Sequence, residues 1–404
     1  MLAVEEAQQR VLDEVRVLDD EVVLLANAHG RVLREDVAAP YDLPRGDNSA
    51  MDGYALIADD TPGELRVLED IAAGHVPKVR IERGTASRIM TGALIPDGAD
   101  AVAQVEITDG GREVVRVNEA VARGTNVRRR GDDMRAGDII LRSGALIRAA
   151  EIGALASAGK TDVRVGRRPT VAILATGDEI VDIDRAPAFN QVPNSNSYAL
   201  AALAAESGAL PQIRGIVRDD RDATIAAIES ALDCDFILSS GGVSVGAFDF
   251  VKDALDALGG ETKFWRVAMK PGKPVVLSRV RERLYFGLPG NPVSSMVGFL
   301  LFVRPALRKA MGESAHFDPI VSIRTTAPLR SKGDRRTYLR VRVIARDGEL
   351  VAEPMRAQGS HISTSMLGAN GLAILEAGTT LVNEHERVIV LLFGPMEHRM
   401  EHRL

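Results

Sequence analysis

The sequence predicts a multidomain α/β protein with a central, doubly wound, mostly parallel sheet and a small all-β domain at the C-terminal end. Three observations lead to this fold class. Strand-like and helical segments alternate after Pro169, short alternating segments separated by Gly and Asp fill about 64–146, and helical patterns vanish after His316. Alternating strands and helices are typical of a parallel sheet with right-handed crossovers. Short alternating segments bounded by turn residues predict β-rich units.

Chain length is consistent with a division into several domains. Domains typically contain about 100–200 residues, and the chain has 404. We expect an N-terminal region over 1–168 that contains the β-rich lobe, an α/β domain over 169–312 and a C-terminal β domain over 313–404.

The N-terminal region begins with a helical pattern, because apolar residues recur at Val4, Ala7, Val11 and Val15. A short helix or strand is expected over 22–31. The remaining N-terminal elements are a turn-rich loop over 37–54, the lobe, and an Ala-rich helix over 148–159.

The α/β domain follows as alternating segments. The expected strands are 170–175, 210–217, 235–239, 263–268, 275–277 and 284–287. The expected helices are 194–207, 223–232, 250–258 and 293–311. Ser195 or Asn196 is expected to cap the first of these helices.

Composition narrows the classes of function. The net charge of −6 and a pI near 5.8 argue against general binding to nucleic acids or membrane surfaces. Aromatic residues make up only 4% of the chain, too few for stacking single-stranded nucleic acid. The apolar run 296–303 is too short to span a bilayer. Cys234 is the only cysteine, so no internal disulfide forms, and a reducing cytoplasm suits the chain.

The stretch 235–250 organises the α/β domain, because a buried strand leads through a glycine-rich turn into a helix. Gly241, Gly242 and Gly246 allow positive φ and let a ligand approach the backbone. Ligands of open α/β sheets bind beyond the carboxyl ends of the strands. A tight connection without a ligand is the alternative for such a turn taken alone.

Acidic residues follow three predicted strands at the same edge of the sheet: Asp178 and Glu179, Asp219 and Asp220, and Asp249. Carboxylates gathered at one edge repel one another unless a cation lies between them. Oxygen ligands without His or Cys suggest Mg²⁺.

Lys270 and Lys273 flank a Pro-Gly turn at the same edge, where they either pair with these acids or bind an oxyanion. Together with the acids and the glycine turn, they suggest magnesium-dependent phosphoryl or pyrophosphate chemistry.

Two loops outside the α/β domain carry further polar residues. The loop 47–54 contains Asp47 and Asp52, and such loops are often simple turns. Three consecutive arginines occupy 128–130. They form either a solvated face or a clamp for phosphate, which suits the fork geometry of arginine.

These motifs together resemble the MoeA-type molybdopterin molybdenumtransferases, a family of molybdenum insertases that includes the E domain of gephyrin. The matching strings cover nearly the whole chain and keep their order and spacing. They are 4–8 (VEEAQ), 47–54 (DNSAMDGY), 89–93 (IMTGA), 127–131 (VRRRG), 175–179 (ATGDE), 239–246 (SSGGVSVG), 270–274 (KPGKP) and 287–292 (GLPGNP).

The resemblance implies an elongated N-terminal region, a MogA-like α/β domain, and a homodimer whose active cleft lies between subunits. It implies insertion of molybdenum, supplied as molybdate, into adenylylated molybdopterin with release of AMP. Mg²⁺ is the implied cofactor, and an adenylyltransferase is a possible partner protein.

The same resemblance assigns roles to individual residues. Asp52, Glu179, Asp219, Asp249, Lys270 and Lys273 are expected to be catalytic, and Glu179, Asp219 and Asp249 to support the metal. Of these, Asp52 would reach in from the partner subunit, together with Thr91. The substrate-binding residues are expected to be Thr91, Arg128, Asp133, Gly241, Gly242, Ser244, Gly246, Pro289, Asn291, Arg340 and Ser360.

Two other functions stay open at this point. A nucleotide pyrophosphatase of the competence-damage type, or an adenylyltransferase of the MogA type, would share the α/β domain but resemble only about a third of the chain. A gephyrin-like scaffold that binds peptides would need no chemistry. The loop 47–54 and the C-terminal β domain argue against the first alternative, and the polar sheet edge argues against the second.

Overall fold

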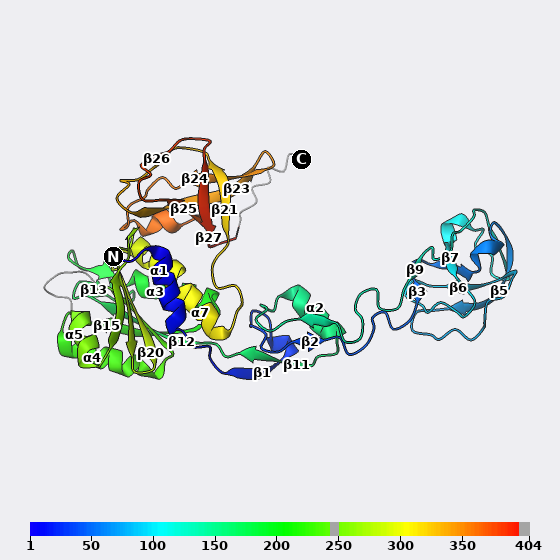
Figure 1. Cartoon of the computed structure of the whole chain (residues 1–404), viewed down its shortest axis with the longest axis horizontal. Helices are drawn as coiled ribbons and strands as arrows, with labels where there is room; N and C mark the ends of the chain where they lie inside the picture. Colours follow the sequence, from blue (N-terminus) through cyan, green and yellow to red (C-terminus); the bar gives the residue numbers. More distant parts are fainter. Residues whose placement is uncertain (243–249, 396–404) are drawn as a thin grey trace.

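The computed structural model of the chain describes residues 1–242 and 250–395 and shows an extended molecule (Figure 1). An α/β body lies at one end, with a β domain beside it. A stem leads from the α/β body to a separate lobe at the far end. The expected α/β multidomain class is confirmed.

The α/β body is built on a six-stranded sheet in the order β15-β12-β16-β20-β19-β17. The strands are β12 (Thr170–Thr176), β15 (Leu210–Val217), β16 (Phe236–Ser240), β17 (Glu261–Arg266), β19 (Pro274–Val280) and β20 (Arg283–Leu288). The first four strands of this order are parallel, whereas β19 runs antiparallel to both of its neighbours. The sheet is therefore mostly parallel, as expected.

Helices cover both faces of this sheet because successive residues of its central strands point to opposite sides. In β12, Val171 and Ile173 join one hydrophobic core, whereas Ala172 and Leu174 join the other. The first face carries α1 (Val4–Glu14), α3 (Ser195–Glu206), α6 (Pro292–Gly298), a π-helical turn (Phe299–Val303) and α7 (Arg304–Met311); the second carries α4 (Arg221–Ser230) and α5 (Phe250–Ala257).

Helix α1 packs on the α/β body although it comes first in the chain. Its buried residues Val4, Ala7 and Val11 belong to the same core as β12 and α7. The periodic spacing predicted the helix, and the packing shows which sheet it covers.

The stem contains two short antiparallel pairs and one helix. These are β1 (Asp20–Leu24) with β11 (Asp162–Gly166), β2 (Val37–Ala38) with β10 (Ile139–Leu141), and α2 (Ala149–Ser157).

The lobe is a five-stranded sheet in the order β7-β4-β6-β5-β8, with a small β3–β9 pair at its base. Its strands are β3 (Asn48–Ser49), β4 (Gly53–Leu56), β5 (Gly63–Ile71), β6 (Thr85–Ile89), β7 (Ala101–Gln104), β8 (Val114–Val117) and β9 (Val127–Arg128).

The C-terminal domain is a sheet that closes on itself, because β23 pairs with both β24 and β25. Its main strands are β21 (Ile320–Thr325), β23 (Arg336–Arg346), β24 (Glu349–Pro354), β25 (Gly371–Leu375) and β27 (Arg387–Leu392), and β22 (Leu329–Arg330) pairs with β26 (Leu381–Val382). The short strand β18 (Met269–Lys270) of the α/β body adds to this sheet beside β23. The two domains therefore share hydrogen bonds next to the Lys-Pro-Gly-Lys turn.

Candidate active site

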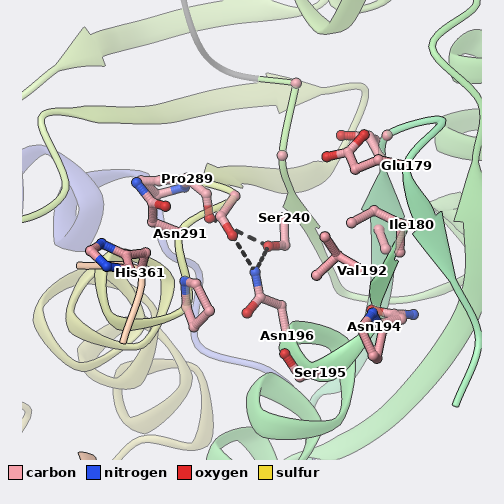
Figure 2. A pocket seen from close by; sticks show the side chains of 18 of the residues that line it. Glu179, Ile180, Val192, Asn194, Ser195, Asn196, Ser240, Pro289, Asn291 and His361 are labelled. Atoms are coloured by element: carbon pink, nitrogen blue, oxygen red, sulfur yellow. Dashed lines mark hydrogen bonds between the residues drawn. The ribbon is translucent and has the colours of Figure 1, made fainter. Parts of the chain in front are cut away.

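A cavity of about 670 Å³ lies at the carboxyl edge of the parallel strands. The ends of β12 and β16, the turn after β20, the start of α3 and one loop of the C-terminal domain form its wall (Figure 2). The wall includes Thr176, Glu179, Ile180, Val192, Asn194, Ser195, Asn196, Asp219, Ser240, Gly241, Gly242, Pro274, Pro289, Gly290, Asn291, Pro292 and His361. Open α/β sheets place ligands at this edge.

The glycine turn after β16 has the backbone conformation that the sequence predicted. Gly241 has a φ of +100° and Gly242 a φ of +64°. A Cβ at Gly241 would lie 2.5 Å from the carbonyl oxygen of Thr176, and a Cβ at Gly242 would lie 2.9 Å from Thr176 Oγ1. Only glycine combines this conformation with so close a neighbour. The turn therefore keeps its backbone accessible from the cavity.

Helix α3 begins at the cavity wall. Asn194, and not Ser195 or Asn196 as expected, caps the helix, because its Oδ1 accepts the amide of Ser197 at 3.3 Å. Asn196 is thereby free to donate from Nδ2 to Ser240 Oγ at 2.8 Å and to the carbonyl oxygen of Gly290 at 2.7 Å (Figure 2). These two bonds fix the strand end and the turn after β20 around one cavity. The positive end of the α3 dipole faces this region and favours an anion there.

Acidic residues lie on the opposite part of the wall. The amide of Asp219 donates to Asp178 Oδ1 at 3.2 Å, which brings the ends of β12 and β15 together. Burial raises the pKa of Asp219, and the negative charges of Asp178 and Glu179 raise it further. Glu179 and Asp219 both line the cavity. Additional negative charge is therefore unfavourable here unless a cation is present.

Glu179 and Asp219 are the described carboxylates of the wall that could serve a magnesium ion. Within residues 1–242 and 250–395, no three His, Cys, Asp or Glu side chains are gathered closely enough to hold a metal ion. Glu179 and Asp219 supply hard oxygen atoms of the kind that Mg²⁺ prefers, and a cation would relieve the repulsion that adds to the effect of burial on the pKa of Asp219. The third expected ligand, Asp249, lies outside the described residues, as do Ser244 and Gly246.

Six of the predicted site residues line this one cavity: Glu179, Asp219, Gly241, Gly242, Pro289 and Asn291. The predicted lysines lie beside it. Lys273 is exposed and directly precedes Pro274, which lines the wall. Lys270 belongs to β18 and pairs with Thr337 of β23. The positive charge of Lys270 helps to lower the pKa of Asp334, after the hydrogen bond from Arg335.

Arg340 and Ser360 hold the loop through which the C-terminal domain reaches the cavity. Arg340 is only 1% exposed, and its Nη2 donates to the carbonyl oxygens of Ala357 at 3.2 Å and Gly359 at 3.3 Å. Burial lowers the pKa of Arg340 to about 10. The carbonyl oxygen of Ser360 accepts the amide of Val293 at 3.1 Å. The loop is therefore tied to both domains.

The remaining predicted residues lie in the lobe or at its base, at the end of the molecule that is far from the cavity (Figure 1). Asp52 Oδ1 accepts both the amide of Thr91 at 2.7 Å and its hydroxyl at 2.8 Å, and these bonds lower the pKa of Asp52. Arg128 and Asp133 are exposed. Within one chain, this group does not meet the cavity.

The three-arginine run is divided between two roles. Arg129 Nη1 donates to Asp47 Oδ2 at 2.7 Å, and Arg130 pairs with Asp42. Arg128 forms no ion pair with a described residue. The clamp of three arginines is therefore not supported, because two of them pair with Asp47 and Asp42. These two pairs lie where the stem meets the lobe, a junction that we call the neck.

Six polar residues of the described wall were not among the predicted site residues: Thr176, Asn194, Ser195, Asn196, Ser240 and His361. The first five lie at a helix start or a strand end, so the topology could have indicated them. His361 comes from another domain, and its local sequence gives no indication of this position.

The whole chain matches known proteins consistently. Residues 2–159 match the model of the MoeA N-terminal region (domain I and II), 172–309 that of a probable molybdopterin binding domain, and 322–393 that of the MoeA C-terminal region (domain IV). The chain is 38% identical to the molybdopterin molybdenumtransferase of Nostoc sp., covering 92% of this chain and 88% of that protein. It is 33% identical to the protein of the same name from Bacillus subtilis, covering 97% of this chain and 94% of that protein.

Solved structures agree with this relationship. A molybdopterin biosynthesis MoeA protein from Pyrococcus horikoshii superposes with a TM-score of 0.84 at 29% identity, covering 97% of this chain and all of that chain. A second structure of the protein from this organism gives a TM-score of 0.79 at 30% identity, covering 98% of this chain and all of that chain. The chain therefore belongs to the MoeA family of molybdopterin molybdenumtransferases.

Proposed function

We propose that this enzyme transfers molybdenum from molybdate to adenylylated molybdopterin, releases AMP and thereby forms the molybdenum cofactor in a magnesium-dependent reaction. The observation that carries the proposal is the composition of the cavity wall. The glycine turn and the start of α3 favour anions, whereas Glu179 and Asp219 favour a cation. Both substrates are anions, so a site for both needs these two kinds of surface side by side.

Each part of the wall has a distinct task in this proposal. Gly241 and Gly242, with Pro289 and Asn291, bind the phosphate-bearing substrate through an accessible backbone. Glu179, Asp219 and Asp249 would hold Mg²⁺, which supplies charge neutralisation when bound. Lys270 and Lys273 attract the oxyanion from the adjoining turn. Positioning two anions beside each other supplies a large part of the acceleration.

The C-terminal domain contributes a further cationic group in this proposal. Arg340 is buried without a carboxylate partner among the described residues, and its Nε has no hydrogen-bond partner. An unpaired buried cation is unfavourable, and a nearby oxyanion would offset that cost. Arg340 and Ser360 therefore remain our candidates for contacts with substrate.

The distance of the lobe from the cavity supports a homodimer. Asp52, Thr91, Arg128 and Asp133 serve the reaction only if the lobe of one subunit approaches the cavity of its partner. In this arrangement, the active cleft lies between subunits. Mixing two inactive variants, Asp52→Ala and Glu179→Ala, tests it, because half of the mixed dimers' sites would then be intact and activity would return.

We place the reaction in the cytoplasm, where the single free thiol of Cys234 suits a reducing compartment. An adenylyltransferase that supplies the adenylylated substrate is a possible partner protein in this proposal. No helix of the described chain is long and apolar enough to cross a bilayer.

One assay separates the proposal from its alternatives. The protein is mixed with adenylylated molybdopterin and Mg²⁺, and AMP is measured with and without molybdate. Release of AMP that requires molybdate supports the insertase. Release of AMP at the same rate with and without molybdate supports a hydrolase, and binding of peptides without turnover supports a scaffold.

A further inference from the structure

Of the wall residues that lie within 1–242 and 250–395, His361 is the one that comes from the C-terminal domain. It lines the cavity together with Pro289 and Asn291 of the turn after β20, and Figure 2 draws all three in the wall. The only other ionisable side chains of the described wall are the carboxylates of Glu179 and Asp219. Among the described residues of the wall, His361 is thus the only one that can carry a positive charge.

The position of His361 is built by several contacts. Arg340 holds the carbonyl oxygens of Ala357 and Gly359, and Gln358 Nε2 donates to the carbonyl oxygens of Arg340 and Met355, both at 2.9 Å. The amide of Val293, in the first turn of α6, holds the residue before the histidine. The loop therefore has little freedom to move away from the cavity.

Gly359 leaves room for the imidazole ring. A Cβ at Gly359 would lie 3.0 Å from His361 Cε1 and 3.0 Å from Ile362 Cδ1. Any side chain at this position would push against the ring. The absence of one allows the ring to lie where Figure 2 shows it.

We infer that His361 is a further binding residue of the cavity, and that its imidazole contacts an oxyanion of the bound substrate. The inference rests on the proposed function for the identity of the substrate. The oxyanion is either the phosphate of the adenylylated pterin or molybdate, because both present oxygen acceptors to a ring N–H. Its positive charge, when the ring is protonated, adds attraction where the two carboxylates repel.

The test compares the isosteric pair His361→Gln and His361→Glu, which differ only in charge. Dissociation constants are measured for AMP and, separately, for molybdate, together with the KM for adenylylated molybdopterin. Loss of a charge-assisted hydrogen bond in His361→Gln weakens binding of the contacted anion roughly tenfold. The added carboxylate in His361→Glu weakens it by on the order of a further tenfold. His29→Gln, an exposed histidine of the stem, serves as the control and leaves binding unchanged.

The two probes identify the contacted group. Weaker binding of AMP alone identifies the phosphate as the contacted group, and weaker binding of molybdate alone identifies the metal oxyanion. Equal constants for His361→Gln and His361→Glu would show that the residue only shapes the loop, and this overturns the inference. Failure of the wild-type protein to bind either anion overturns it as well. A wild-type protein that binds AMP but releases none in the presence of molybdate refutes the proposed function, while the binding series still decides the role of His361.

Discussion

Replacing Asp235 by asparagine tests how the stem is fixed to the α/β body. Asp235 precedes β16, and its side chain is only 7% exposed. Its carboxylate accepts two bonds from Arg167, both at 2.8 Å, and one from the amide of Thr170 at 2.9 Å. Arg167 follows the last strand of the stem, so this fork joins the stem to the sheet.

The expected loss follows from the geometry. Breaking a buried ion pair costs about 3–5 kcal/mol, but the side chain of Arg167 remains 38% exposed and is partly hydrated after the substitution. We therefore expect Asp235→Asn to lower the free energy of unfolding by about 2 kcal/mol. At about 3 °C per kcal/mol, the melting temperature falls by roughly 6 °C. The neighbouring exposed pair Asp233–Arg214 gives the matched control, because Asp233→Asn costs less than about 1 kcal/mol.

The pH dependence provides a second test of the same contact. Burial alone would raise the pKa of Asp235, but the bonds from Arg167 and Thr170 outweigh burial and lower it. The stabilisation is therefore complete above the unfolded pKa of about 4 and is lost as the pH falls through the lower folded value. Thermal unfolding followed by circular dichroism at several pH values measures both effects. Equal losses for Asp235→Asn and Asp233→Asn at pH 7 would refute the reasoning.

Three further predictions concern the site and the neck. Asp219→Asn removes a carboxylate whose pKa is raised, so the melting temperature rises at pH 7 and this gain vanishes below about pH 4. The rate of AMP release by this variant falls on the order of 100-fold, and an unchanged rate would remove Asp219 from the mechanism. Gly241→Ala places a side chain on a strained backbone, close to the carbonyl oxygen of Thr176, so the free energy of unfolding drops by about 1–3 kcal/mol and AMP binding is lost. A variant that binds AMP as tightly as the wild-type protein would contradict an open glycine turn. Asp47→Asn releases Arg129 and widens the distribution of distances between spin labels on the lobe and on the α/β body; an unchanged distribution would show that the neck is held by other contacts.

Local patterns predicted much of the fold. The apolar runs of β12 and β16 and the periodicity of α1 specified these elements, because burial on two faces or on one face leaves a direct record in the sequence. The glycine turn was predictable for the same reason, since Gly241 and Gly242 supply a conformation that other residues avoid. Pairing between distant segments left no such record. The union of β18 with β23 is an example, because neither strand's sequence indicates its partner.

The candidate site shows the same division. Glu179 and Asp219 were predictable because the carboxyl ends of parallel strands share one edge. His361 was not, since its position depends on the docking of one domain against another. The arginine run was ambiguous, because Asp47, the partner of Arg129, and Asp42, the partner of Arg130, lie about 80–90 residues away in the chain. These carboxylates compete with any anion for the same guanidinium groups.

A crystal structure of this protein with AMP, molybdate and Mg²⁺ tests the central claim most directly. We predict that the phosphate of AMP lies against the turn of Gly241 and Gly242, near Asn291, and that the metal ion lies at Glu179 and Asp219. Ordered AMP bound elsewhere on the protein, with this cavity empty and the two carboxylates facing solvent, would contradict the account.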